Sequence, residues 1–141
     1  MIDQKVRDFL DRHTAGVPAT TRPDGTARQS VVYFALDGDR LLVSTEPRRA
    51  KSRDVVRTGR ASLCVMRGAA PHPSVTLEGI ARIRATGIGA DTATVWSRIG
   101  GRPVEPMTDA DLAGMNRLIL EITVGRVYAV SYLDEDEGER P

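Results

Sequence analysis

Phosphate recognition is the chemistry that the residue types between positions 44 and 53 support best. This short segment combines hydroxyl-bearing side chains with four cations, in the set Ser44, Thr45, Arg48, Arg49, Lys51, Ser52 and Arg53. It joins an expected strand to an expected helix, and the first N–H groups of a helix have no partner inside it. Arginine can bind two phosphate oxygens with its planar fork, and lysine supplies a compact charge. The segment therefore predicts a cradle for a phosphate ester.

A solvated run of positive charge is the competing interpretation, because most charge runs in proteins lie on the surface without a ligand. Arg49 and Lys51 are two positions apart, and residues at that spacing do not share one face of a helix. Residue types and spacing alone leave both interpretations open.

The composition limits the other classes of function. A chain of 141 residues that is 40% hydrophobic fits one domain, which we expect at residues 1–133, followed by an acidic, disordered tail at 134–141. The net charge of +1 provides no basic excess for nucleic acid or a membrane surface. The N-terminal segment carries charges throughout, and no apolar run is long enough to span a bilayer. We expect a cytoplasmic protein with neither kind of partner.

Cysteine and histidine are too few to form a metal site or a disulfide. The one cysteine, Cys64, lies in an apolar stretch and is expected to be a buried, inert thiol. No Cys/His cluster has the spacing of zinc ligands, so no bound metal is expected. His72, between two prolines, is a candidate for the rim of a ligand pocket, although a histidine in a loop is more often simply exposed.

The hydrophobic pattern predicts the elements that would position the cationic segment. Strands are expected at residues 17–21, 28–36, 40–45, 61–66, 74–84 and 118–132. Helices are expected at residues 2–12, 46–59, 91–99 and 109–115. Gly59 is expected to end the second helix, Thr108 to cap the fourth, and Gly125 to allow a bulge in the last strand.

Six strands with short helices predict a mainly β fold. This count favours a closed antiparallel barrel over a parallel doubly wound sheet, in which strands would alternate with long helices. The helical segment at 91–115 would then lie outside the barrel.

Three segments carry a resemblance to a known family. They are TRPDGTARQSVVYF at 21–34, LLVSTEPRRAKSRDVVRTGRASLCVM at 41–66 and VTLEGIARI at 75–83. In this order and spacing they resemble the pyridoxamine 5'-phosphate oxidase-like split β-barrel family, and more narrowly its actinobacterial branch that depends on coenzyme F420. The resemblance covers most of residues 17–85 and the last strand.

The resemblance implies a six-stranded split barrel that forms a homodimer with two cofactor sites at the subunit interface. Arg49, Lys51 and Ser52 would hold the phosphate, and the strand from Gln29 to Val32 would line the ring system. The full set of expected cofactor-binding residues is Gln29, Ser30, Val31, Val32, Ser44, Thr45, Arg49, Ala50, Lys51, Ser52 and His72. No catalytic residue is assigned, because the cofactor itself carries the hydride chemistry.

FMN and coenzyme F420 both present a tricyclic ring and a phosphate on a ribityl-type chain, so the cradle does not separate them by physics. The resemblance favours F420, and thus an oxidoreductase that transfers hydride between a reduced deazaflavin and a small organic substrate. The oxidases of vitamin B6 carry a further basic residue where this chain has residues 32–34, so pyridoxine-phosphate oxidation is not expected. The alternatives are an FMN-binding oxidoreductase, a noncatalytic F420 or flavin carrier, and a barrel with a vestigial site.

Overall fold

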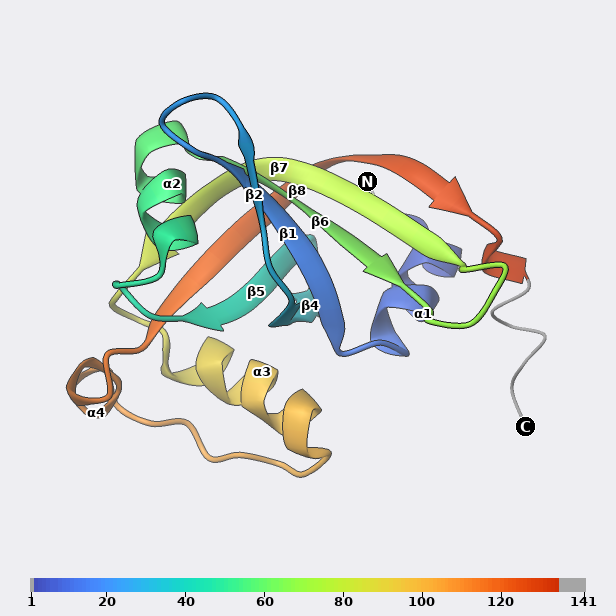
Figure 1. The fold of residues 1–141 in the computed structure, drawn as a ribbon. Coiled ribbons are helices and arrows are strands. Elements are labelled where there is room, and N and C mark those ends of the chain that lie inside the picture. Colours follow the sequence, from blue (N-terminus) through green and yellow to red (C-terminus); the bar gives the residue numbers. More distant parts are fainter. Residues whose placement is uncertain (1, 135–141) are drawn as a thin grey trace.

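The computed structural model describes residues 2–134. Eight strands form one antiparallel sheet in the order β2-β1-β6-β7-β8-β5-β4, with β3 paired to β1. The elements are α1 (Gln4–Asp11), β1 (Ala15–Thr21), β2 (Ala27–Gln29), β3 (Val32–Tyr33), β4 (Ala35–Asp37), β5 (Arg40–Thr45), α2 (Ala50–Thr58), β6 (Arg60–Met66), β7 (Ser74–Arg84), α3 (Gly89–Gly100), α4 (Asp109–Gly114) and β8 (Leu118–Ser131). Figure 1 shows α1 and α2 at opposite ends of the curved sheet, with α3 beside β5.

Capping residues set the ends of the helices. The side chain of Asp3 accepts a hydrogen bond from the Val6 N–H at the start of α1, and Thr108 accepts one from Asp111 at the start of α4. Gly59 ends α2 in the left-handed conformation with φ of 68°. The roles predicted for Thr108 and Gly59 are thereby confirmed, whereas α3 begins at Gly89 rather than at residue 91.

Two hydrophobic clusters lie on the two faces of the sheet. Along β6 the buried residues Ala61, Leu63 and Val65 alternate with more exposed ones, so one face of the strand packs into the main cluster. The second cluster lies between the outer face of the sheet and the helical segment, and it contains Ala35, Leu42, Ile88, Val95, Leu112 and Ile119. This packing places α3 and α4 outside the barrel, as expected. It also shows that Cys64, on the outer face of β6, is only partly buried, so the expectation of a buried thiol is wrong.

A glycine at the centre of β7 allows the sheet to bend. The pairing of β7 with β8 shifts register at two places, and Gly125 is the extra residue at the second of them. A Cβ added to Gly79 would lie 1.8 Å from the Thr123 carbonyl oxygen, so only glycine fits where the two strands approach each other. The bulge predicted at Gly125 is confirmed.

The strand predicted at residues 28–36 is divided into β2, β3 and β4. Phe34 N–H donates to the Thr14 carbonyl at 3.0 Å, and the register that follows puts Pro18 opposite Ser30 at a hydrogen-bonding position. Proline has no N–H to donate, and residues 30–31 lie outside the ladder to β1.

The number of strands and the closure of the barrel therefore differ from the prediction. After Phe34 the chain leaves β1 and pairs with β5, so β3 and β4 have different neighbours. The sheet has eight strands instead of six, and its path is open rather than a closed ring of hydrogen bonds.

Two further expectations concern the C-terminal tail and membrane-spanning segments. Of the tail predicted at 134–141, only Asp134 is described, and its carboxylate lies 2.6 Å from Lys5 Nζ. The rest of that prediction falls outside the described residues. Within residues 2–134, no helix has the length and apolar character needed to cross a membrane.

Candidate cofactor site

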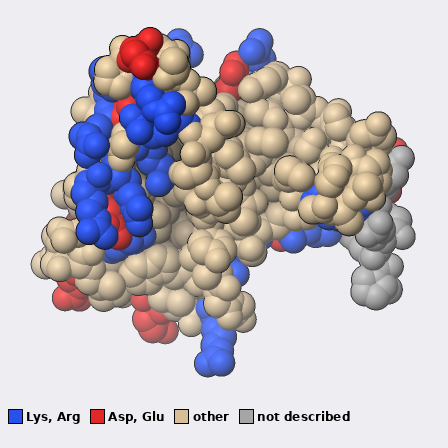
Figure 2. Space-filling view, in the orientation of Figure 1, with Lys and Arg blue, Asp and Glu red and all other residues tan. Residues whose placement is uncertain are grey.

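A groove of about 410 Å³ lies where β5, α2 and α3 meet the segment between β2 and β3. Eight of the predicted site residues line it, namely residues 30–32, residues 44–45 at the end of β5, and residues 49–51 at the start of α2. The structure thus brings together residues from three separate parts of the predicted set. On the face drawn in Figure 2, the largest group of Lys and Arg side chains lies on the side that carries α2, and smaller groups lie elsewhere.

The start of α2 directs two cations at this groove. Arg49 directly precedes the helix in an extended conformation, with φ of −69° and ψ of 132°. Because Arg49 is not yet helical, it and Lys51 can line the same groove despite their spacing of two. Neither side chain forms an ion pair with another residue in the described part of the chain. In the first helical turn, the Ser52 N–H donates to the Arg49 carbonyl at 3.0 Å, which leaves the N–H groups of Ala50 and Lys51 as donors without partners inside the helix.

Burial lowers the pKa of Lys51. The neighbouring charge of Arg49 lowers this pKa further, whereas the carboxylate of Glu46 opposes the shift. A cation that is desolvated beside another cation gains most from a bound anion. The electrostatics of this end of the groove therefore favour a negatively charged ligand.

Thr45 supplies a hydroxyl beside the two cations. Its side chain lines the groove, the residue is 3% exposed, and its Oγ1 has no hydrogen-bond partner among residues 2–134. Buried polar atoms in folded proteins nearly always have a partner. The lone hydroxyl thus provides an additional donor for a ligand oxygen.

Arg117 is a groove residue that the sequence did not reveal. It directly precedes β8, and its Nη2 and Nε donate to Ser44 Oγ at 2.7 and 3.2 Å. Its Nη1 lies 3.3 Å from Glu46 Oε1, and its Cζ is 6.0 Å from the centre of the Trp96 ring. Arg117 thus connects the end of β5 to the wall formed by α3.

Arg28 and the wall residues of α3 were also missed. Arg28 Nε donates to Asp54 Oδ2 at 2.6 Å, and the Thr20 hydroxyl donates to the same oxygen at 2.8 Å. Alternation along the strand predicted at residues 28–36 could have revealed Arg28, because Arg28 and Ser30 are two positions apart and would share one face of it. The same alternation puts Gln29 on the other face, and Gln29 does not line the groove. Val95, Trp96 and Ile99 come from a helix remote in sequence. The aromatic ring of Trp96 could border a ring system, but large aromatic side chains more often fill the core, so residue type alone did not assign it to the groove.

Two other predicted residues do not line this groove. Ser52 is buried, and its Oγ donates to the Glu46 carbonyl at 3.0 Å, so its side chain braces the turn between β5 and α2. His72 lies in the loop between β6 and β7, at the end of these strands away from α2 (Figure 1). Neither side chain adds a donor to the groove of its own chain.

A cluster of charges anchors α3 to the sheet. Glu121 on β8 is hydrogen-bonded by Arg40 at 2.8 Å and by Arg82 at 2.6 Å, and Arg84 lies 2.5 Å from Asp91 at the start of α3. Burial opposes ionisation of Glu121, but these arginines outweigh burial and lower its pKa. The cluster fixes the helix whose next turns form the groove wall.

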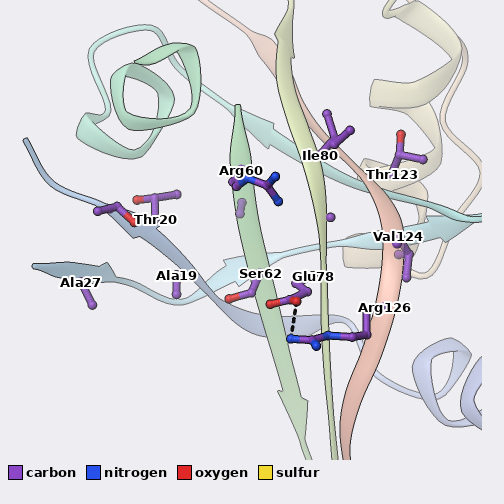
Figure 3. Close-up of a pocket in the computed structure, with 14 residues that line it drawn as sticks. Ala19, Thr20, Ala27, Arg60, Ser62, Glu78, Ile80, Thr123, Val124 and Arg126 are labelled. Atoms are coloured by element: carbon purple, nitrogen blue, oxygen red, sulfur yellow. Dashed lines mark ion pairs between the residues drawn. The ribbon is translucent and has the colours of Figure 1, made fainter. Parts of the chain in front are cut away.

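A second hollow of about 700 Å³ lies on the outer face of β1, β6, β7 and β8 (Figure 3). Small side chains such as Ala19 and Ser62 form much of its floor, and Glu78 and Arg126 form an ion pair of 2.6 Å across it. Ile80 stands at its edge with 68% of its surface exposed. None of the predicted site residues lines this hollow, despite its larger volume.

The fold is a mainly β antiparallel sheet with short helices, consistent with the split-barrel class, and a groove lined by Arg49 and Lys51 lies at one of its strand-to-helix junctions. Comparison with family models gives one match, to pyridoxamine 5'-phosphate oxidase, over residues 2–131. The chain belongs to this family. The resemblance drawn from the three sequence segments is confirmed.

Solved structures share the fold at low sequence identity. A conserved hypothetical protein of Mycobacterium tuberculosis is 23% identical with a TM-score of 0.72, over 90% of this chain and 82% of that one. An F420 reductase is 24% identical with a TM-score of 0.71, over 90% and 98% of the two chains. A heme storage protein from Vibrio cholerae is 10% identical with a TM-score of 0.69, over 92% and 95%. At these identities the likeness shows the fold alone.

Curated sequences, and possible metal-binding clusters among residues 2–134, gave no match. A search among curated protein sequences found no match. In the part of the chain that the structure describes, no group of three or more His, Cys, Asp or Glu side chains is placed to hold a metal ion.

Proposed function

We propose that the protein binds a phosphate-bearing deazaflavin, coenzyme F420, in the groove and transfers hydride between it and a small organic substrate. FMN is the alternative cofactor. The observation that carries this proposal is the pair Arg49 and Lys51, which lines the groove without an ion-pair partner in residues 2–134, beside the lone hydroxyl of Thr45.

The residues of the groove fit such a cofactor. Two cations, helix N–H groups and a hydroxyl form the donor set that a phosphate ester needs. Val31, Val32 and Trp96 offer apolar surface to a flat ring system. The backbone groups of residues 30–31, which lie outside the ladder to β1, can hydrogen-bond the polar edge of a ring.

The bound cofactor would supply the hydride chemistry. The chain would bind and orient it: Arg49 and Lys51 fix the phosphate end, and the segment at 30–32 supports the ring. The α3 wall, held by the charge cluster around Glu121, keeps water from one side of the groove. The substrate would approach from the open side.

We propose that a second copy of the chain packs against the open side of the groove and covers it. Val31 is 74% exposed at the edge of the groove, which is unfavourable for an apolar side chain unless it is covered. The hollow outer face of β1, β6, β7 and β8 supports a homodimer, since its small side chains allow close approach of another sheet. The loop with His72 would then belong to the rim of the second subunit's groove.

Ligand titration of cofactor-stripped protein tests the proposed function. Coenzyme F420, FMN and the dephosphorylated form of each are added in separate titrations while ring fluorescence is followed. Hemin is also titrated, as a ligand of a different class. F420 is expected to bind more tightly than its dephosphorylated form by at least about 100-fold, because two charge-assisted contacts would be lost. Preference for FMN would assign the flavin alternative, and exclusive binding of hemin or of no ligand would refute the proposal.

A turnover assay distinguishes the proposed oxidoreductase from a noncatalytic carrier that only binds the cofactor. Oxidation of bound F420H2 that depends on an added organic substrate is expected. Tight binding without any such oxidation across a panel of substrates would assign the protein to the carriers.

Cofactor affinity is expected to fall at alkaline pH as Lys51 loses its proton. Burial and Arg49 lower its pKa from the ordinary 10.5, so the protonated form that attracts phosphate prevails below that lowered pKa and disappears above it. The dissociation constant measured from about pH 7 to about pH 10 should rise with pH as the protonated form of Lys51 is lost. Lys51→Arg stays charged and should show a flat profile in this window; an equally steep rise there would contradict the assignment.

A further inference from the structure

We infer that Arg117 is a positioning residue that makes the Ser44 hydroxyl an obligate hydrogen-bond donor to an anionic or carbonyl oxygen of the ligand. This inference rests on the proposed function, because it assigns a contact within the proposed cofactor groove. It concerns Arg117, which was absent from the predicted site, and the Ser44 hydroxyl to which Arg117 donates.

The geometry at Ser44 fixes the direction of its hydrogen bonds. A serine hydroxyl has one O–H donor and two acceptor lone pairs. Arg117 Nη2 donates to Ser44 Oγ at 2.7 Å and Nε donates at 3.2 Å, so two N–H groups of one cation converge on this oxygen and disfavour the approach of a further donor. A guanidinium stays protonated at every physiological pH and cannot accept a hydrogen bond. Ser44 therefore has only its O–H left to offer.

The guanidinium of Arg117 is itself held in place. Its Nη1 faces Glu46 Oε1 at 3.3 Å, and the other oxygen of that carboxylate accepts from Arg48 Nε at 2.6 Å. The indole of Trp96 lies beside the guanidinium, and the Arg117 side chain is only 21% exposed. With these contacts the fork points at Ser44 rather than into solvent.

The remaining O–H of Ser44 faces a groove that is otherwise prepared for acceptors. Ser44 and Thr45 both line the groove, and the Thr45 hydroxyl is without a partner in the described part of the chain. Two N–H donors from a cation polarise the Ser44 O–H and strengthen the bond that it donates. A ligand oxygen at this point is favoured, whereas a ligand N–H or O–H finds no acceptor on Ser44. The phosphate ester and the ring carbonyl of a flavin-type cofactor both provide such an oxygen.

A double-mutant cycle in cofactor binding tests the inference. Dissociation constants are measured for the wild type, Ser44→Ala, Arg117→Met and the double variant, each with FMN, F420 and their dephosphorylated forms. Ser44→Ala is expected to weaken binding about 10- to 100-fold, since a hydrogen bond to a charged or polarised oxygen is lost. Arg117→Met is expected to cost about 10-fold in the wild-type background and little in the Ser44→Ala background, because Arg117 acts through Ser44.

Conservative variants provide the controls. Ser44→Thr keeps the hydroxyl and should restore binding. Arg117→Lys keeps the charge but loses the fork, so it should bind as weakly as Arg117→Met. Thermal unfolding of each variant, measured without ligand, identifies any loss of binding that is due to misfolding.

The outcomes separate this inference from the proposed function. A loss confined to the phosphorylated ligands would locate the acceptor on the phosphate, and an equal loss with both forms would locate it on the ring; either result supports the inference. Additive losses, or wild-type affinity in Arg117→Lys, would show that Arg117 acts as a simple cation and would overturn it. Failure of the wild type to bind any of these ligands would instead refute the proposed function.

Discussion

Replacing Arg49 and Lys51 together by alanine is expected to weaken cofactor binding by about 10²- to 10⁴-fold. Each cation would make a charge-assisted hydrogen bond of about 1.5–3 kcal/mol to the phosphate, and the two losses combine. Neither residue has an ion-pair partner among residues 2–134, so the thermal unfolding temperature of the free protein should change little. Fluorescence titration and a thermal melt of the same samples measure both quantities.

Arg48→Ala/Arg53→Ala is the matched control for this double variant. It removes two cations from the same segment, but neither residue lines the groove. Arg48 pairs with Glu46, and Arg53 donates to the Arg48 carbonyl at 3.0 Å. The control should lose less than about tenfold in affinity, because exposed charges act weakly through salt-containing water. Equal losses in the two double variants would favour the solvated positive run over a built phosphate cradle.

Glu121→Gln is expected to destabilise the protein by about 3 kcal/mol. The carboxylate is 3% exposed and accepts from Arg40 and Arg82, so the variant removes the buried counter-charge of two partly exposed arginines. Partial exposure of both arginines keeps the expected value at the lower end of the range for buried pairs. The midpoint of urea unfolding at neutral pH measures the loss.

Glu78→Gln on the neighbouring strand is the control for Glu121→Gln. Its partner Arg126 is 65% exposed, and the pair should contribute less than about 1 kcal/mol. The two variants should also differ in acid. The folded-state pKa of Glu121 lies below its ordinary value of 4.5, so its stabilising effect is complete above that pH and disappears as the pH falls through the folded-state pKa. The gap between the wild type and Glu121→Gln should therefore close in acid, and a gap that persists there would contradict the role of the ionised carboxylate.

Sequence patterns predicted the elements whose side chains alternate regularly. The nearly continuous apolar run of β6 and the alternation in β7 identified these two strands, and Gly59 correctly marked the end of α2. The cationic segment at 44–53 was recognised because the cradle comes mostly from consecutive residues. The interruption at Pro18 was missed, because a missing N–H becomes visible only when the strand register is known.

The rest of the groove could not be predicted, for physical reasons. Ser44 and Arg117 are 73 positions apart, and their contact depends on the pairing of β5 with β8. Trp96 reaches the groove because α3 packs on the outer face of the sheet through Leu42 and Val95. No periodic pattern in a single sequence encodes which outer face a short helix covers.

Pro18 has a consequence for solvation and selectivity that reaches beyond the strand count. A residue with an N–H at this position could donate to the Ser30 carbonyl and extend the ladder between β1 and the segment at 27–33. With proline there, β1 has no N–H to donate to that carbonyl, which stays free to accept from water or from a ligand. A ligand that binds the Ser30 carbonyl therefore does not have to break a hydrogen bond between two strands. Pro18, which does not line the groove, keeps a short stretch of backbone available as a docking edge for a planar molecule.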